Sequence, residues 1–431
     1  MSTKNLEFNK VLLNITLVVM FTFPKLNLNF AGIPLYIIDF LLILNWLVVD
    51  RKNQKSLDKI IFTIFFSSIF FICISELFAF LTLNYSIEPF YSLIRTLLTY
   101  SLLILLFRRI QSEQEFYRAF IWVVRFSLVT VLLVVLSSIP QTRDFITKNV
   151  FELSFLDPAK GFLDKWDKAD IDEVLRGRSL IGVSIITGYY LVFVYVLNMI
   201  VTKINRNSLS KITQKIFQYI IIIGVLFTNS RGPILTLILV ILVDFLYLNS
   251  FRKISSIVIS SVIIIGITFV FDLSDLELYF NRVIDGSEKL IDGNEGFGES
   301  ENERLLAYIE PFEVIGRNLF LIFFGLGISE RNIIDFQGRN LSDHAVFASA
   351  IYSYGLIFAL LFISLLGYLI FKMINSSSVY RPNQVQFFVV IFIWQLLGHA
   401  IISETRGMNI LMITIFIISA DFFKTKSNIL S

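Results

Sequence analysis

The sequence predicts an all-α, polytopic membrane protein of about twelve transmembrane helices, and three observations support this prediction. Hydrophobic residues make up 55% of the 431-residue chain and charged residues only 16%, whereas soluble domains carry about 25% charged residues. The mean hydropathy is +0.74. The apolar segments run for about 17 to 25 residues, which is the length of helix that crosses a hydrocarbon core roughly 30 Å thick.

Each predicted span is an apolar segment between polar connections. The first span follows Lys4 and Lys10, as in a signal peptide, but Pro24 and Lys25 stand where a small-residue cleavage site would be, so we expect an uncleaved helix. An even number of spans places both termini on one side. The predicted spans are 11–23, 32–49, 60–83, 90–107, 119–139, 179–201, 216–228, 233–249, 255–271, 345–371, 385–402 and 408–423.

Lys and Arg residues are distributed unevenly between the two sets of connections, and this predicts the orientation. One set, together with the terminal segments, holds 19 of these cations, whereas the short loops of the other set hold three: Lys25, Arg231 and Arg406. Because cytoplasmic loops are enriched in Lys and Arg, the richer set and both termini are predicted to be cytoplasmic.

Two long connections are predicted on the opposite face. The first, about 140–178, has eight acidic and seven basic residues and ends in Arg176-Gly-Arg178. The second, 272–344, has fifteen acidic and six basic residues. It contains an apolar stretch from Leu319 that is too short to span, so we expect it to dip into the membrane interface. The chain then divides into helices one to nine (1–271), a large, partly helical loop (272–344) and three last helices (345–431).

Composition excludes several function classes. Cys73 is the single cysteine, so neither an intrachain disulfide nor a thiolate metal cluster can form. The two histidines, His344 and His399, cannot build a zinc site without carboxylates, and we expect no metal and no other cofactor. A net charge of +3 is too small to indicate a nucleic-acid partner.

Three ionisable residues fall within the outward halves of predicted spans: Asp39, Glu76 and Arg95. Charges at membrane depth are costly, so they usually face the bundle interior and have partners. We expect these three to form one buried cluster. It would be either the polar floor of an outward-facing cavity or an ion pair that stabilises helix packing.

Arg231 and Arg406 stand at outward helix starts, where the charge bias should exclude cations. Arg231 lies in the turn 228–233, with Pro233 in the first turn of the next helix; Arg406 follows Glu404 between the last two spans. A guanidinium offers paired donors that match phosphate oxygens, and helix starts add partial positive charge. We therefore predict a phosphate docking site; the alternative is a plain anchor for lipid headgroups.

His344 opens the helix that follows the large loop. Asp343, with Ser342, is an N-capping residue type that places the imidazole at the outward face. A histidine at an interface is usually structural, but this one ends the largest predicted loop. Its ordinary pKa suits acid–base chemistry near neutral pH.

Three blocks of this sequence resemble the superfamily of bacterial O-antigen polymerases and O-antigen ligases. The first is the Ser230-Arg-Gly232 turn. The second is Glu303-Arg304 with the later Gly325-Leu-Gly327, and the third is His344 followed by Tyr354-Gly355. Ligases of this superfamily usually have a polar residue and a second glycine at the positions occupied here by Ala345 and Phe358, so the resemblance favours a polymerase.

The resemblance implies a GT-C-like fold in the bacterial cell inner membrane and a metal-independent glycosyltransferase of lipopolysaccharide or related polysaccharide biosynthesis. Such an enzyme joins oligosaccharide repeat units carried on undecaprenyl pyrophosphate at the periplasmic face. Its expected partners are that lipid-linked oligosaccharide, membrane lipids and a chain-length regulator protein, with no nucleic acid. The alternatives are an O-antigen ligase or O-linking oligosaccharyltransferase that uses the same donor, and a polysaccharide transporter or flippase. The expected catalytic residues are His344, Arg231, Arg304 and Asp343, and the expected substrate-binding residues are Arg406, Arg178, Glu404 and Glu303.

Overall fold

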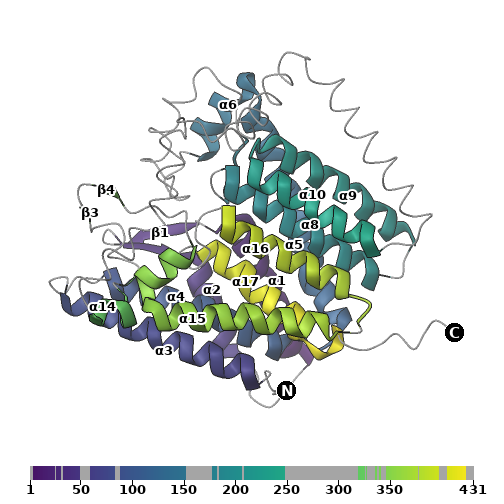
Figure 1. Cartoon of the computed structure of the whole chain (residues 1–431). Coiled ribbons are helices and arrows are strands. Elements are labelled where there is room, and N and C mark those ends of the chain that lie inside the picture. The colour runs from purple at the N-terminus through teal and green to yellow at the C-terminus, as the bar shows by residue number, and fades with distance from the viewer. Residues whose placement is uncertain are drawn as a thin grey trace, which may run out of the picture.

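Helices running side by side account for most of the computed structural model shown in Figure 1. The bundle helices are α1 (Thr3–Thr22), α2 (Ile37–Val48), α3 (Lys59–Thr82), α4 (Glu88–Arg109), α5 (Glu113–Ser138), α8 (Ser184–Ile204), α9 (Ser208–Phe227), α10 (Arg231–Tyr247), α15 (Val346–Ile374), α16 (Arg381–Leu397) and α17 (Thr405–Ser419). The structure describes residues 3–24, 26–30, 33–48, 59–82, 88–151, 177–181, 184–205, 208–247, 319–325, 327, 335–336, 339–340, 346–376, 378–397 and 405–423.

Short elements lie between the bundle helices. They are α6 (Pro140–Ile146), the π-helix η1 (Thr147–Phe151), α14 (Leu319–Phe324) and the 3-10 helix η5 (Asp421–Phe423). Two small antiparallel hairpins pair β1 (Asn27–Phe30) with β2 (Ile33–Tyr36), and β3 (Asp335–Phe336) with β4 (Arg339–Asn340). The all-α prediction did not include these hairpins. The apolar run after residue 32 was assigned wholly to a helix, whereas its first residues pair as β2.

Within the described residues, every bundle helix overlaps one predicted span, and the predicted span 255–271 lies outside them. Four helical segments there are long and apolar enough to cross a membrane: Lys59–Phe78, Glu113–Ser138, Ser184–Ile204 and Ser353–Ile374. Shorter apolar helices accompany them. A mostly helical fold with such helices fits a membrane protein, as predicted, while the number of spans and the orientation stay predictions.

Several helices begin earlier than hydropathy predicts. α9 begins at Ser208 rather than near residue 216, and α5 begins at Glu113 rather than near 119. Hydropathy detects the apolar part of a helix, whereas its first turns carry polar residues such as Lys211 and Lys215. In α5, the N-cap Ser112 accepts a hydrogen bond from the Glu115 backbone N–H, which is the usual way to satisfy a helix start.

The bundle has two ends of different composition. The site end, toward β1 and α6 in Figure 1, is where α8, α10, α15 and α17 begin. At the other end, the basic end, the Lys10 Nζ atom of α1 lies 3.7 Å from the Glu115 carboxylate of α5. There, Lys203 Nζ of α8 also donates to the Asn383 side-chain oxygen of α16 over 2.6 Å. Cations at the basic end are Lys10, Arg108, Arg109, Lys203 and Arg381.

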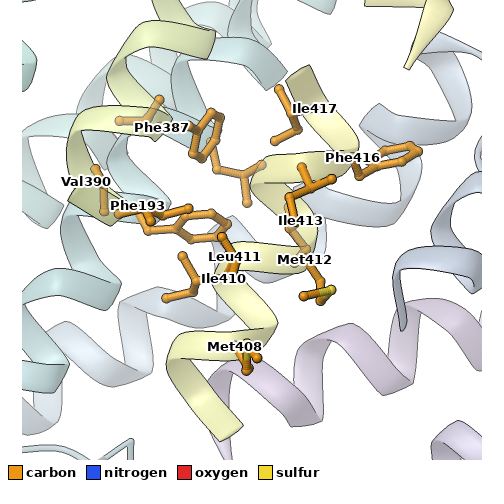
Figure 2. Packing of buried hydrophobic residues seen from close by; sticks show 14 of the residues in the cluster. Phe193, Phe387, Val390, Met408, Ile410, Leu411, Met412, Ile413, Phe416 and Ile417 are labelled. Carbon is orange, nitrogen blue, oxygen red and sulfur yellow. The ribbon is translucent and has the colours of Figure 1, made fainter. Parts of the chain in front are cut away.

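Two helices, α8 and α17, form the centre of the bundle. Residues 407–419 of α17 are all buried, as is most of α8, and a helix that is apolar all round belongs in an interior. Figure 2 shows Phe193 of α8 and Phe387 of α16 beside the apolar side chains of α17; the two ring centroids lie 5.1 Å apart. This packing holds the starts of α8 and α17 at one end of the bundle.

Three glycines form a tight junction between α14 and α15, here called the glycine junction: Gly325, Gly327 and Gly355. All three have positive φ, and Gly355 (φ 85°, ψ 170°) interrupts α15. The Gly327 N–H donates to the Ser353 carbonyl oxygen over 2.8 Å, and a Cβ on Gly355 would lie 2.0 Å from the Phe323 carbonyl oxygen. The predicted span at 345–371 is therefore two helical pieces rather than one continuous helix. The apolar stretch at 319 packs against α15 and α3, and its dip into the membrane interface stays a prediction.

We predict that Gly355→Ala lowers the free energy of unfolding by about 3 kcal/mol or more, because an L side chain is strained at this φ and its Cβ would collide with backbone atoms. Gly367→Ala is the matched control in the same helix, since nothing lies within 4 Å of its added Cβ. Thermal unfolding of both variants in detergent measures the difference. Equal midpoints for the two variants would contradict the tight junction.

Candidate functional site

The turn between α9 and α10 presents Arg231 at the site end. Asn229 adopts a left-handed conformation (φ 49°), which Asn tolerates better than most residues. The Ile234 N–H donates to the Ser230 carbonyl oxygen over 3.2 Å, so α10 begins directly at Arg231. Pro233 lies in the first turn, where its missing N–H costs nothing. Arg231 therefore stands where the first backbone amides of α10 lack partners within the helix.

Arg178 reaches the same turn through its backbone. The N–H of the preceding Gly177 donates to the Phe227 carbonyl oxygen over 3.0 Å. A Cβ on Gly177 would lie 2.6 Å from that oxygen and 2.5 Å from the Val134 carbonyl oxygen. The Ser137 hydroxyl accepts from the Arg178 N–H over 2.7 Å and donates to the Arg178 carbonyl oxygen over 3.0 Å. Arg178 is thus held between the ends of α5 and α9.

The start of α8 lies beside the same turn. The Ser179 and Thr187 hydroxyls are 3.0 Å apart, which ties the segment before α8 to its first turn. Gly188 allows α8 to approach α10 closely, since an added Cβ would lie 2.6 Å from the Pro233 ring. We call residues 177–181 and 227–233 the α8–α10 corner. It brings the backbone next to Arg178 to the α9–α10 turn that carries Arg231, so the segments of two predicted arginines come from separate connections to one place.

A small apolar cavity of about 10 Å³ lies beside this corner. Trp394 of α16 lines the cavity. Its side chain is fully buried, and its indole Nε1 has no hydrogen-bond partner among the described residues. The Trp394 ring stacks on the Tyr189 ring of α8 with centroids 5.2 Å apart. The cavity joins the α8–α10 corner to the first turns of α17. Its lining residues are Met20, Phe21, Ile181, Ile186, Tyr190, Trp394 and Ile410.

A charged cluster lies on the other side of α17. The Arg95 guanidinium of α4 lies over the Tyr36 ring, with its carbon 3.7 Å from the ring centroid, and Arg95 interacts electrostatically with Asp39 of α2. Asp39 and Arg95 are near enough to interact, but both side chains are half-buried, so the predicted buried cluster of three residues stays a prediction. Glu76 is 1% exposed and lies in α3, which packs against α4.

The structure describes the backbone of some predicted site residues and not of others. Arg178 and Arg231 belong to the α8–α10 corner, and Arg406 is the second residue of α17 at the same end. The remaining predicted site residues lie outside the described part of the chain: His344, Arg304, Asp343, Glu404 and Glu303. The glycine junction nevertheless joins the second and third sequence blocks, because Gly325 packs on the Ser353–Tyr354 backbone.

The residues that build the corner carry no pattern that the sequence predictions used. Ser137 and Gly177 contact Arg178 or its neighbours, and Gly188 contacts Pro233. A small residue close to a polar turn at a helix end could have indicated these contacts. Small residues are common throughout membrane helices, however, so the pattern is not specific. Among the described residues no three His, Cys, Asp or Glu side chains are grouped as a metal site requires, and the predicted metal independence stays a prediction.

Comparison with known proteins finds no protein family whose model matches this chain and no curated protein that resembles it significantly.

We predict that Ser137→Ala lowers the free energy of unfolding by about 1–3 kcal/mol, because it leaves the Arg178 N–H and carbonyl oxygen without their hydroxyl partner. Ser138→Ala is the matched control, since the Ser138 hydroxyl donates to Val135 of its own helix. Thermal unfolding in detergent compares the two. A midpoint for Ser137→Ala no lower than that of Ser138→Ala would show that Ser137 does not hold the corner.

Proposed function

We propose that this protein is a polymerase of O-antigen or a related surface polysaccharide. It would join oligosaccharide repeat units carried on undecaprenyl pyrophosphate at the periplasmic face of the bacterial inner membrane. The observation that carries the proposal is the hydrogen bond from the Gly177 N–H to Phe227. It brings the segments of Arg178 and Arg231 together at the end of an apolar bundle. The three sequence blocks of the polymerase and ligase superfamily support the same function.

The chemistry fits a cationic corner at the membrane surface. In the reaction, an acceptor hydroxyl oxygen attacks the anomeric carbon of the donor sugar, and the bond from that carbon to the diphosphate oxygen breaks. The diphosphate leaves with the bonding electron pair, so negative charge grows on it in the transition state. Fixed guanidinium groups and helix-start amides stabilise such charge. Arg178 and Arg231 are the proposed diphosphate ligands, together with Arg304.

The acceptor proton needs a base or a water relay. His344 is proposed for this role, with Asp343 next to it, and Glu303 and Glu404 are proposed to bind substrate. In sequence, His344 lies eleven residues before Gly355 of the glycine junction. Since the diphosphate is a good leaving group, cation binding to it lowers the reaction barrier more than a strong base would. A lipid-linked donor enters sideways from the bilayer, which suits a site at the helix ends.

Deleting the gene is expected to leave lipopolysaccharide with the core and a single repeat unit, because unit transfer to the core continues without polymerisation. Gel electrophoresis of the extracted glycan measures this. Bare core with lipid-linked polymer accumulating would indicate the alternative, a ligase acting on the same donor. Unchanged glycan would exclude the whole class.

Arg231→Ala is expected to reduce chain extension by about 10- to 100-fold, because one charge-assisted contact to the diphosphate contributes roughly 1.5–3 kcal/mol. Arg231→Lys keeps the charge but loses the paired donors, so its chain extension should lie between that of the natural protein and that of Arg231→Ala. Arg118→Ala is the control, since Arg118 is exposed on α5 near the basic end. The glycan ladder of complemented deletion strains, at equal membrane levels of protein, measures the effect. A full ladder from Arg231→Ala would remove Arg231 from the site.

A further inference from the structure

Arg125 is a cation on the outer surface of α5, near the middle of a helix that is long and apolar enough to cross a membrane. At a rise of 1.5 Å per residue it stands about 18 Å from the first residue, Glu113, and about 20 Å from the last, Ser138. Its side chain is exposed. Within the described part of the chain, the ion pair closer than 4.0 Å is Lys10–Glu115, so Arg125 has no carboxylate of its own there.

The Trp122 ring holds the guanidinium of Arg125, whose carbon lies 4.9 Å from the ring centroid. Trp122 lies one helical turn nearer the basic end, so the cation leans toward that end, as a long basic side chain in a bilayer does. The polar end of the helix is nevertheless out of reach, because Trp122 itself stands about 10 Å beyond Glu115. The charge therefore lies along an apolar stretch, where a cation without a partner is costly.

The exposed side of α5 around Arg125 is otherwise apolar. Trp122, Val129 and Leu132 are 43%, 37% and 57% exposed, and with Arg125 they follow one another in steps of three and four residues. We call these four residues the α5 seam. The opposite side of α5 is buried, and the helix packs against α1, α8 and α9, so it cannot turn the seam inward. A second helix laid along such a seam meets its residues in turn.

We propose that the α5 seam docks a transmembrane helix of another protein, and that this helix carries an aspartate or glutamate facing Arg125. Charge complementarity selects a carboxylate, because its two oxygens match the paired donors of a guanidinium. The apolar residues on either side of Arg125 supply the packing surface. This inference concerns a partner and does not depend on the proposed function.

A second copy of this chain fits the seam less well. In the described parts of its apolar helices, the carboxylates are already engaged or buried. Asp39 interacts electrostatically with Arg95, and Asp244 with Lys203. Glu76 is 1% exposed, so it cannot reach a neighbouring molecule.

A phospholipid also fits the seam less well than a helix does. A lipid phosphate lies at the level of the headgroups, and the exposed Arg118, seven residues nearer the basic end, is closer to that level. Arg125 stands about 10 Å further along the helix, among apolar side chains.

The test measures association between the full chain and synthetic transmembrane peptides in phosphatidylcholine vesicles, by energy transfer between fluorophores. Each peptide is a polyleucine helix of about 20 residues with Glu, Lys or Leu at its centre. We expect the Glu peptide to bind the natural protein about threefold to thirtyfold more tightly than the Leu peptide. The Lys peptide should bind no better than the Leu peptide.

Variants of α5 test whether Arg125 is the partner of the carboxylate. Arg125→Leu should bind the Glu and Leu peptides equally, and Arg125→Glu should reverse the preference toward the Lys peptide. Arg118→Leu is the matched control on the same helix and should keep the preference of the natural protein. Thermal unfolding of each variant excludes misfolding as the cause.

Four results would overturn the inference. They are equal binding of the Glu and Leu peptides by the natural protein, and a preference for the Glu peptide that survives Arg125→Leu. A preference that vanishes when phosphatidylglycerol is added would assign the seam to a lipid. A dimer of the natural protein that Arg125→Leu dissociates would assign it to a second copy. The assay contains no glycan, so the glycan of the deletion strain tests the proposed function separately.

Discussion

Apolar surroundings leave a backbone amide or carbonyl no water to bond with, so irregular backbone within a helical bundle needs partners inside the protein. Three irregular segments in the described part of the site end follow this constraint. Gly177 bonds to Phe227, Arg178 to Ser137 and Gly327 to Ser353. The Ser75 hydroxyl donates to the Phe324 carbonyl oxygen where α14 ends against α3. The same bonds that satisfy these segments also hold the arginine-bearing turns in place.

The same constraint explains where glycine is used. Gly177 and Gly188 let the ends of four helices, α5, α8, α9 and α10, meet at distances that a side chain would prevent. Gly355 interrupts α15 so that α14 can pack into the break. In this bundle the close approaches lie near the polar ends, while α17 packs in the middle through large apolar side chains. The central helices supply rigidity, and the glycine contacts at the site end determine the positions of the polar turns.

Charge distribution gives the two ends different chemistry. At the basic end, Lys10 pairs with Glu115, and Lys203 bonds to the Asn383 side chain, so these cations contribute to packing between helices. At the site end, the backbone at Gly177 and Arg178 bonds to the ends of α9 and α5, close to the turn that carries Arg231, and Arg95 of α4 lies on the Tyr36 ring.

The amino-acid sequence predicts the apolar helices, the cation-rich connections and the arginines of the short loops, because hydropathy and charge depend on composition over one segment. It placed Asp39 and Arg95 in one cluster, since two charges in neighbouring apolar helices need each other. Tertiary structure decided the rest: the break at Gly355, the contact of Gly325 with Ser353–Tyr354, and the meeting of Arg178 with the α9–α10 turn. These depend on which backbones come within van der Waals distance across the bundle, and no pattern along a single helix encodes that distance.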